Sequence, residues 1–225
     1  MDANGRIYSK YIDSEAITSL ENLITTKSSE IYQLTMIKLG AKLGTILDKK
    51  LPKESSCLVA STAEDADYLT QGILNSLKPS HKTMAAVFWN NHYKIPDGES
   101  VAPVVHQYLE PGYDEAKSLV VAKSIISGSC VVRTNILFLI EKLKVEKIYI
   151  VAPIIHNQSE QLLRKEFPEG ISSLFEFIFL AEDSFKDDTG EVKPGIGGQI
   201  YKLLGMEDQP ARTSFMPKLV RDLVF

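Results

Sequence analysis

Two loops of small residues in the sequence could hold an anionic or flat ligand. The first reads Ser127-Gly128-Ser129-Cys130 and follows the apolar run 118–122. Small residues let backbone N–H groups approach an anion, and a helix that begins at Cys130 would add partial positive charge, so this turn is a candidate phosphate site. A plain strand-to-helix turn capped by Ser127 or Ser129 is the alternative. The second loop, Pro194-Gly195-Ile196-Gly197-Gly198, permits the tight curvature by which main-chain groups recognise a flat ring or a phosphate, although a turn needs no ligand.

A third candidate loop, Ser61-Thr62-Ala63, is followed directly by the acidic pair Glu64-Asp65. Two carboxylates beside the loop would repel a phosphate. This loop therefore predicts anion binding only if the carboxylates turn away from the ligand or a cation bridges them.

Several single residues allow both a functional and a structural interpretation. Phe88 and Trp89 could stack on a base, although a place in the core is favoured for an aromatic pair at a strand end. Cys130 could be a reactive thiol of low pKa, although a buried structural cysteine is favoured. The acidic pairs 182–183 and 187–188 could bind a cation, with a solvated acidic loop as the favoured alternative. The four histidines share no short metal-ligand spacing, so no metal site is expected among them.

Composition sets limits on the class of protein. The chain has 225 residues, of which 44% are hydrophobic and 24% charged, so it can bury a full core as one domain, and disordered and collagen-like classes are excluded. No apolar run approaches the roughly 18 to 20 residues of a membrane-spanning helix, and the first residues do not resemble an export leader. Cys57 and Cys130 show neither disulfide nor zinc spacing, so we expect a cytoplasmic protein. Basic residues are scattered and the net charge is −4, so nucleic acid is not an expected partner.

The elements that must position these loops alternate along the chain. Apolar residues at spacings of three and four predict helices over the first fifty residues, and a polar loop carrying Pro96-Asp97-Gly98 is expected over 90–99. Val-, Ile- and Leu-rich strands that alternate with helices predict an α/β class with a mainly parallel sheet covered by helices. A single domain over 1–205, with a helical N-terminal cover over 1–50, is followed by an extension, 206–225. Strands are expected at 57–60, 84–89, 101–108, 118–122, 147–153 and 175–181, and helices at 66–77, 130–143 and 158–167.

Taken together, the loops resemble those of the uracil phosphoribosyltransferase family, which has the type I phosphoribosyltransferase fold. Residues 189–198, TGEVKPGIGG, are similar to the family's base-binding stretch PGLGDAGDR, and Ser127-Gly128-Ser129-Cys130 resembles its ribose-phosphate loop DPMLATGGS. Residues 59–64 stand where the family has its pyrophosphate loop, VLRAGL. The resemblance covers about residues 15–205. It implies phosphate binding at 127–130, base binding at 194–198, pyrophosphate-loop positions at 61–63, a homodimer, and Mg²⁺ bound with a phosphorylated ligand.

The departures from the family bear on catalysis. Ala122 stands where the family's loop begins with an aspartate, Lys123 follows it, and Ser61 replaces the arginine of the pyrophosphate loop. Loss of each preorganised charge costs about 2–4 kcal/mol of transition-state stabilisation, which Lys123, Arg133 and His92 could offset in part.

The sequence therefore predicts a divergent phosphoribosyltransferase-like protein that binds a nucleotide or nucleobase, with weak or absent transfer from phosphoribosyl pyrophosphate. One alternative is an active divergent phosphoribosyltransferase or nucleoside-processing enzyme. Another is a non-catalytic subunit of a larger assembly that binds a protein partner through residues 206–225.

Overall fold

The chain folds around one mixed sheet, here in a computed structural model that describes residues 5–95 and 100–225. The strand order is β1-β10-β9-β7-β2-β3-β6, and β8 also pairs with β9. The inner strands are parallel, and β1 and β6 are antiparallel edges. This confirms the predicted α/β class. The strands are β1 (Ile7–Tyr8), β2 (Ser56–Thr62), β3 (Lys82–Asn90), β6 (Val104–Leu109), β7 (Ser118–Ala122), β8 (Ile125–Ile126), β9 (Lys147–His156) and β10 (Phe175–Asp183).

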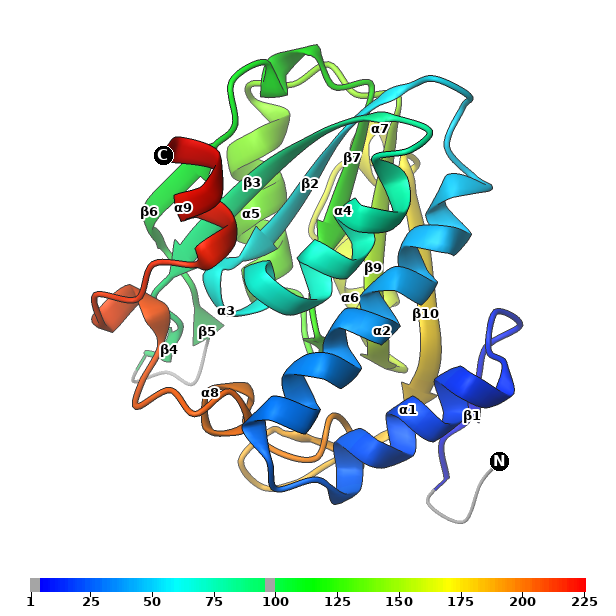
Figure 1. Cartoon of the computed structure of the whole chain (residues 1–225), viewed down its shortest axis with the longest axis vertical. Coiled ribbons are helices and arrows are strands. Elements are labelled where there is room, and N and C mark those ends of the chain that lie inside the picture. Colours follow the sequence, from blue (N-terminus) through cyan, green and yellow to red (C-terminus); the bar gives the residue numbers. More distant parts are fainter. Residues whose placement is uncertain (1–4, 96–99) are drawn as a thin grey trace.

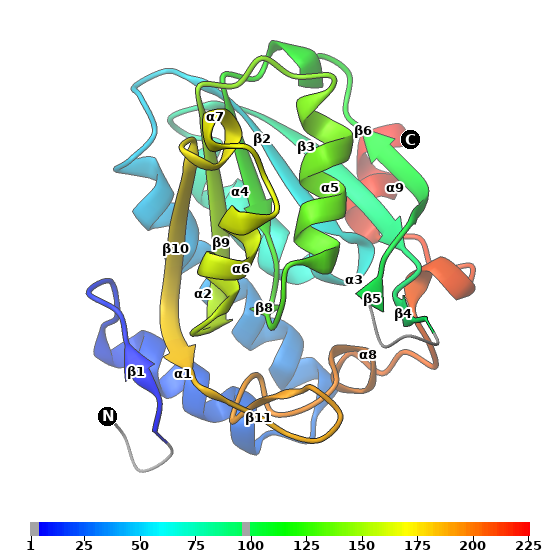
Figure 2. The same cartoon turned by 180° about the vertical axis from the view of Figure 1, so that it is seen from behind.

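Helices cover both faces of the sheet. On one face lie α1 (Ser14–Thr25), α2 (Ser29–Asp48) and α4 (Gln71–Leu77) (Figure 1). A short α3 (Ala63–Asp65) and a π-helical turn (Ala66–Thr70) lead directly into α4. On the other face lie α5 (Cys130–Ile140), α6 (Ser159–Lys165) and α7 (Glu169–Ser172) (Figure 2). Successive residues of a strand face opposite sides, so Leu58 and Val59 of β2 belong to two separate cores, one under each helix layer.

Glycines let α2 pack closely against α4. A Cβ atom built at Gly40 would lie 2.2 Å from the carbonyl oxygen of Leu69, and one at Gly72 would lie 2.3 Å from that of Ile37. No larger residue fits either position without moving backbone. The close packing helps to hold the π-helical turn, and with it Glu64 and Asp65, at the end of β2.

The structure differs most from the predicted elements in three places. The helical cover begins only at Ser14, because Ile7–Tyr8 pairs with β10 as an edge strand. The strand expected over 101–108 is divided at Pro103 into β5 (Ser100–Val101), which pairs with β4 (Tyr93–Lys94), and β6. The strand expected to end at Pro153 continues to His156, between β10 and β8. The Pro96-Asp97-Gly98 part of the predicted loop lies outside the described residues.

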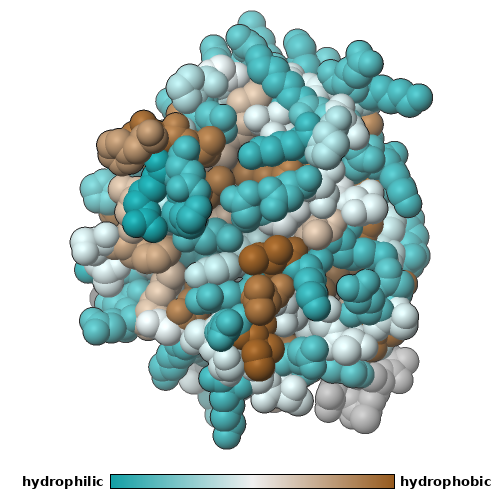
Figure 3. All heavy atoms as spheres, in the orientation of Figure 1, coloured by the Kyte–Doolittle hydropathy of each residue, from teal (hydrophilic) through white to brown (hydrophobic). Residues whose placement is uncertain are grey.

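The extension 206–225 packs on the body of the protein. The carboxylate of Asp67 accepts the backbone N–H groups of Lys218 at 3.0 Å and Leu219 at 2.8 Å, at the start of α9 (Lys218–Val224). The Trp89 indole donates to the carbonyl oxygen of Phe215 at 2.9 Å. Leu219 is buried, whereas the end of α9 is exposed, and Figure 3 shows hydrophobic side chains gathered there. Within the described part of the chain, no helix combines the length and the hydropathy needed to cross a membrane.

Candidate functional site

A cavity of about 600 Å³ opens beyond the carboxyl ends of β7 and β8. In a parallel α/β sheet this is the edge where ligands bind, because the strands there lead into loops and helix N-termini. The loop around β8 and the start of α5 form one wall, His92 and Lys94 with Ser100 and Val101 form a second, and β11 (Phe185–Lys186) with the turn after it forms a third. The described lining residues are His92, Lys94, Ser100, Val101, Lys123, residues 125–133, Leu162, Glu166, Lys186, Thr189 and Gly190.

The predicted phosphate loop lies on this cavity. All four of its residues, 127–130, line it. Nothing lies within 4 Å of a Cβ atom built at Gly128, so the backbone there is open to the cavity. The first turn of α5 contains no acidic residue, and Ser129 makes no side-chain cap. Because the first N–H groups of a helix lack partners within the helix, this end of α5 can accept an anion.

A carboxylate of the chain itself lies beside this loop. Glu166 follows α6, accepts a hydrogen bond from the Ser129 hydroxyl, and pairs with the Arg133 guanidinium, with 2.7 Å between Nη1 and Oε2. It is the only carboxylate among the described lining residues. The two groups best placed to bind a phosphate at this loop are therefore engaged by Glu166.

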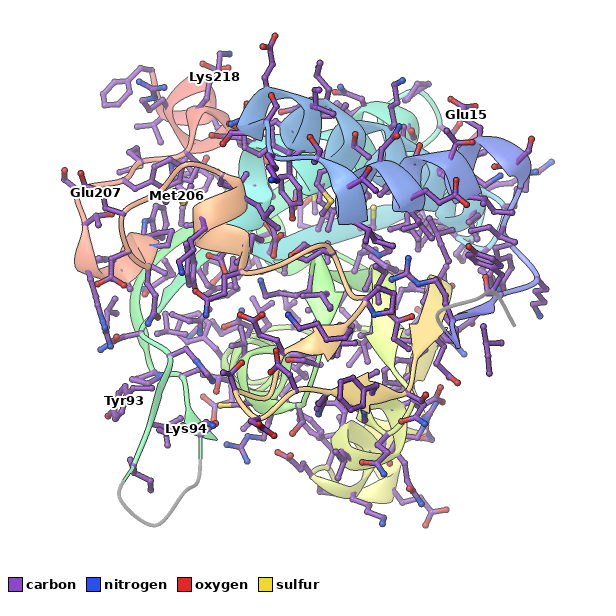
Figure 4. The ribbon with its side chains drawn as sticks, turned by 90° about the horizontal axis from the view of Figure 1, so that it is seen from below. Glu15, Tyr93, Lys94, Met206, Glu207 and Lys218 are labelled. Atoms are coloured by element: carbon purple, nitrogen blue, oxygen red, sulfur yellow. The ribbon has the colours of Figure 1, made fainter. Side chains whose placement is uncertain are left out.

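The other walls of the cavity contribute positive charge. Lys94 of β4 lies beside Tyr93 near the rim of the molecule (Figure 4), and Lys186 belongs to β11. Neither lysine has an ion-pair partner among the described residues, so both charges remain available to a ligand. Burial lowers the pKa of Lys186, and burial together with nearby Lys123 lowers the pKa of His92, which leaves the imidazole neutral at pH 7.

The extension holds the wall that carries His92 and Lys94. The Gln209 side chain accepts the His92 backbone N–H at 2.7 Å and donates to the His92 carbonyl oxygen at 2.8 Å. One residue thus has both its N–H and its C=O bonded by the same partner, as in a hydrogen-bonded pair of an antiparallel sheet. The segment that follows the predicted domain thus positions one side of the cavity.

Lys123 bridges the acidic pair of the third loop. Its ammonium nitrogen lies 2.6 Å from Oδ2 of Asp65, 3.0 Å from Oε1 of Glu64 and 3.2 Å from the Thr62 hydroxyl. Burial disfavours the charged lysine, but the two carboxylates outweigh burial and raise the pKa of Lys123. The cation that bridges the two carboxylates is therefore Lys123 of the chain itself. Because the carboxylates balance its charge, this lysine is not free to bind an anion.

The remaining positions of the third loop lie away from the cavity. Ser61, Ala63 and Ala122 are each no more than 1% exposed and do not line it, and Thr62 donates its hydroxyl to Asp65.

The glycine-rich loop 194–198 packs against the N-terminal segment instead of lining the cavity. Arg6 forms a buried bidentate ion pair with Asp183, at 2.8 and 2.7 Å, and also donates to the Gly195 carbonyl oxygen at 2.7 Å. The Gly195 N–H donates to Asp183. Gly197, at φ +87°, lies so close to α1 that a Cβ atom would be 2.1 Å from the Leu23 carbonyl oxygen. In the same stretch, Thr189 and Gly190 do reach the cavity.

The structure separates the alternatives for the aromatic pair and the cysteine. Phe88 is fully buried and packs edge-on against Phe138 at 5.3 Å, and Trp89 is 5% exposed, so their core interpretation is confirmed. Cys130 lines the cavity, but its thiol donates to the Ser100 carbonyl oxygen at 3.1 Å and burial raises its pKa. The hypothesis of a low-pKa thiol at Cys130 is therefore wrong.

One carboxylate of each acidic pair, Asp183 at the end of β10 and Asp187 after it, stabilises the neighbouring loop. Asp183 pairs with Arg6, and hydrogen bonds, above all from the Thr189 hydroxyl, lower the pKa of Asp187 to about 2. Across residues 5–95 and 100–225, no three His, Cys, Asp or Glu side chains gather in a way that could hold a metal ion.

Sequence reasoning missed Lys94, Glu166 and Lys186. Lys186 had a usable signal, since it follows the last strand at the same edge as the phosphate loop. Lys94 and Glu166 had none, because they reach the cavity through the packing of a hairpin and a short helix.

Comparisons with known proteins place the fold. No family model and no curated protein matches the chain. Among solved structures, the AQ2163 protein from Aquifex aeolicus has a TM-score of 0.67 at 15% identity, over 91% of this chain and 98% of that one. A hypoxanthine phosphoribosyltransferase from Staphylococcus aureus has a TM-score of 0.47 at 12% identity, over 77% and 84%. An adenine phosphoribosyltransferase from Thermoanaerobacter pseudethanolicus has a TM-score of 0.40 at 11% identity, over 65% and 83%. The chain shares the fold of the Aquifex protein.

Proposed function

We propose that the protein is phosphoribosyltransferase-like and binds a phosphorylated nucleotide or a nucleobase. The observation that carries the proposal is the turn 127–130 at the start of α5, open to a cavity whose other walls bear Lys94 and Lys186. The volume of about 600 Å³ lies in the usual range for small-molecule sites. Helix N-terminus and lysines together favour an anion.

Transfer of the phosphoribosyl group from phosphoribosyl pyrophosphate to a bound base is weak or absent. Departure of pyrophosphate needs positive charge at the reacting centre. Here Lys123 is neutralised by two carboxylates and Ser61 supplies no positive charge for the leaving pyrophosphate, while Ala122 lacks the carboxylate that the family uses at the ribose or a metal. Each missing group costs about 2–4 kcal/mol of transition-state stabilisation, and each 1.4 kcal/mol is about tenfold in rate. Two or three such losses reduce turnover by several orders of magnitude.

A uracil-type base is the proposed ring. Support comes from the similarity of residues 189–198 to the uracil family's base-binding stretch; of that stretch, Thr189 and Gly190 line the cavity, whereas 194–198 do not. The proposed Mg²⁺ binds together with the phosphate oxygens of the ligand, because Glu64 and Asp65 are already engaged by Lys123.

The proposal also includes two protein contacts. The first is a homodimer, which sedimentation of the full chain tests. The second is a protein partner for the exposed end of the extension, which deletion of 206–225 tests.

A matched pair of glycine variants tests binding at the loop. Gly128→Asp places a carboxylate at the loop, and Gly170→Asp makes the same change in α7, away from the cavity; neither Cβ atom has a neighbour within 4 Å. We expect uridine monophosphate to raise the melting temperature of the wild type and of Gly170→Asp but not of Gly128→Asp. Equal shifts in all three proteins contradict the assignment of the loop, and no shift with uridine monophosphate or phosphoribosyl pyrophosphate, with and without Mg²⁺, contradicts the function.

Turnover has its own assay. Uracil-dependent release of pyrophosphate from phosphoribosyl pyrophosphate with Mg²⁺ is expected near background. Release at the rate of an ordinary enzyme establishes the active alternative.

A further inference from the structure

Glu166 occupies a position that a bound phosphate needs. Its carboxylate accepts from the Ser129 hydroxyl and pairs with Arg133 at 2.7 Å, and all three side chains line the cavity. Ser129 precedes α5 and Arg133 lies in its first turns. A phosphate bound at the start of α5 would accept from the same two groups, because carboxylate and phosphate oxygens bind the same donors.

The fold holds Glu166 in this place from both sides. Before it, α6 is anchored to the loop by Ser159, whose buried hydroxyl donates to the Ile126 carbonyl oxygen at 3.0 Å, and Leu163 is fully buried. After it, Phe167 is buried and packs edge-on against Phe175 at 5.1 Å. The backbone of Glu166 is therefore fixed at the loop, whereas its side chain is 26% exposed, so the carboxylate can rotate away.

We propose that Glu166 is a specificity-determining residue that competes with the phosphate of the ligand for Ser129 and Arg133. This inference rests on the proposed function. A phosphorylated ligand must displace the carboxylate before it can bind both groups, and it then shares the site with a like charge. The neutral part of the ligand meets no such competitor. The site therefore binds phosphorylated ligands more weakly than its positive walls alone would allow.

A pair of variants on the same helical segment tests the competition. Glu166→Gln removes the charge and keeps the shape. Glu160→Gln is the matched control, because Glu160 pairs with Arg164 at 2.9 Å and does not line the cavity. Calorimetric titration with uridine monophosphate and with uridine separates the phosphate from the rest of the ligand. A Glu166→Ala variant repeats the test without the amide.

We expect Glu166→Gln and Glu166→Ala to bind uridine monophosphate about three- to tenfold more tightly than the wild type, in line with the loss of one partly exposed competing charge. Both Glu166 variants should bind uridine as tightly as the wild type does. The Glu160→Gln variant should bind both ligands with unchanged affinity. Equal or weaker binding of uridine monophosphate by both Glu166 variants overturns the inference and makes Glu166 a residue that positions Arg133. If neither the wild type nor the variants bind any phosphorylated probe, the proposed function itself fails.

Discussion

Replacing Lys123 by methionine removes the positive charge that lies between Glu64 and Asp65. The lysine side chain is 13% exposed, and the two carboxylates are 8% and 1% exposed. Methionine keeps most of the apolar volume, so the main effect is to leave two buried negative charges without their partner. Removal of one member of a buried ion pair costs about 3–5 kcal/mol, because the remaining charge stays buried and uncompensated.

Denaturant unfolding measures this loss. We expect Lys123→Met to lower the free energy of unfolding by about 3–5 kcal/mol at pH 7, with an unchanged denaturant dependence. Lys193→Met is the matched control, since Lys193 also bridges two carboxylates but is 40% exposed, and its loss should stay below about 1 kcal/mol. Fluorescence of Trp89, the single tryptophan, and circular dichroism report the transition.

The pH dependence separates charge from packing. In the wild type the raised pKa of Lys123 means that its stabilisation is complete below the ordinary lysine value of 10.5 and is lost as the pH rises through the folded value. Across the neutral range this contribution is constant. In Lys123→Met the loss should shrink at acid pH, because protonated carboxylates need no partner. If Lys123→Met lowers the free energy of unfolding by less than about 1 kcal/mol, and equally at pH 7 and at acid pH, this account of Lys123, Glu64 and Asp65 is refuted.

Three further changes have defined outcomes. Arg6→Met leaves a buried carboxylate unpaired and should lower the free energy of unfolding by about 3–5 kcal/mol; denaturant unfolding checks this, and a loss within 1 kcal/mol speaks against the buried pair. Deletion of 206–225 uncovers Trp89 and removes its hydrogen-bond partner, so its fluorescence maximum should move to longer wavelength; an unchanged spectrum means that the extension does not pack there. Burial raises the pKa of Cys57 to about 12 and also raises that of Cys130, so a thiol reagent at pH 8 should modify Cys130 more slowly than a free thiol and Cys57 only after unfolding; a fast reaction at either cysteine contradicts this.

The positions of the strands and of the small-residue turn 127–130 were accessible from sequence because their signals are local. Predicted strands of four to eight residues, helical spacing between them, and the small residues at 127–130 each lie within one short window. The topology of a parallel sheet then places the loop at the carboxyl edge, where ligands bind in sheets of this kind. The helical reading of residues 5–13 failed because pairing with β10 and the buried Arg6 ion pair decide their conformation.

What the sequence by itself determined was the α/β class, most of its elements, and the cavity loop that begins α5. Only the tertiary structure decided which charges meet. Lys123 reaches acids 58 and 59 residues away, Arg6 pairs across 177 residues, and Glu166 reaches Ser129 across 37. These contacts depend on strand order, on register and on the direction in which each loop leaves the sheet. No local periodicity encodes those three quantities, and they decide which side chains at the edge stay free to bind a ligand.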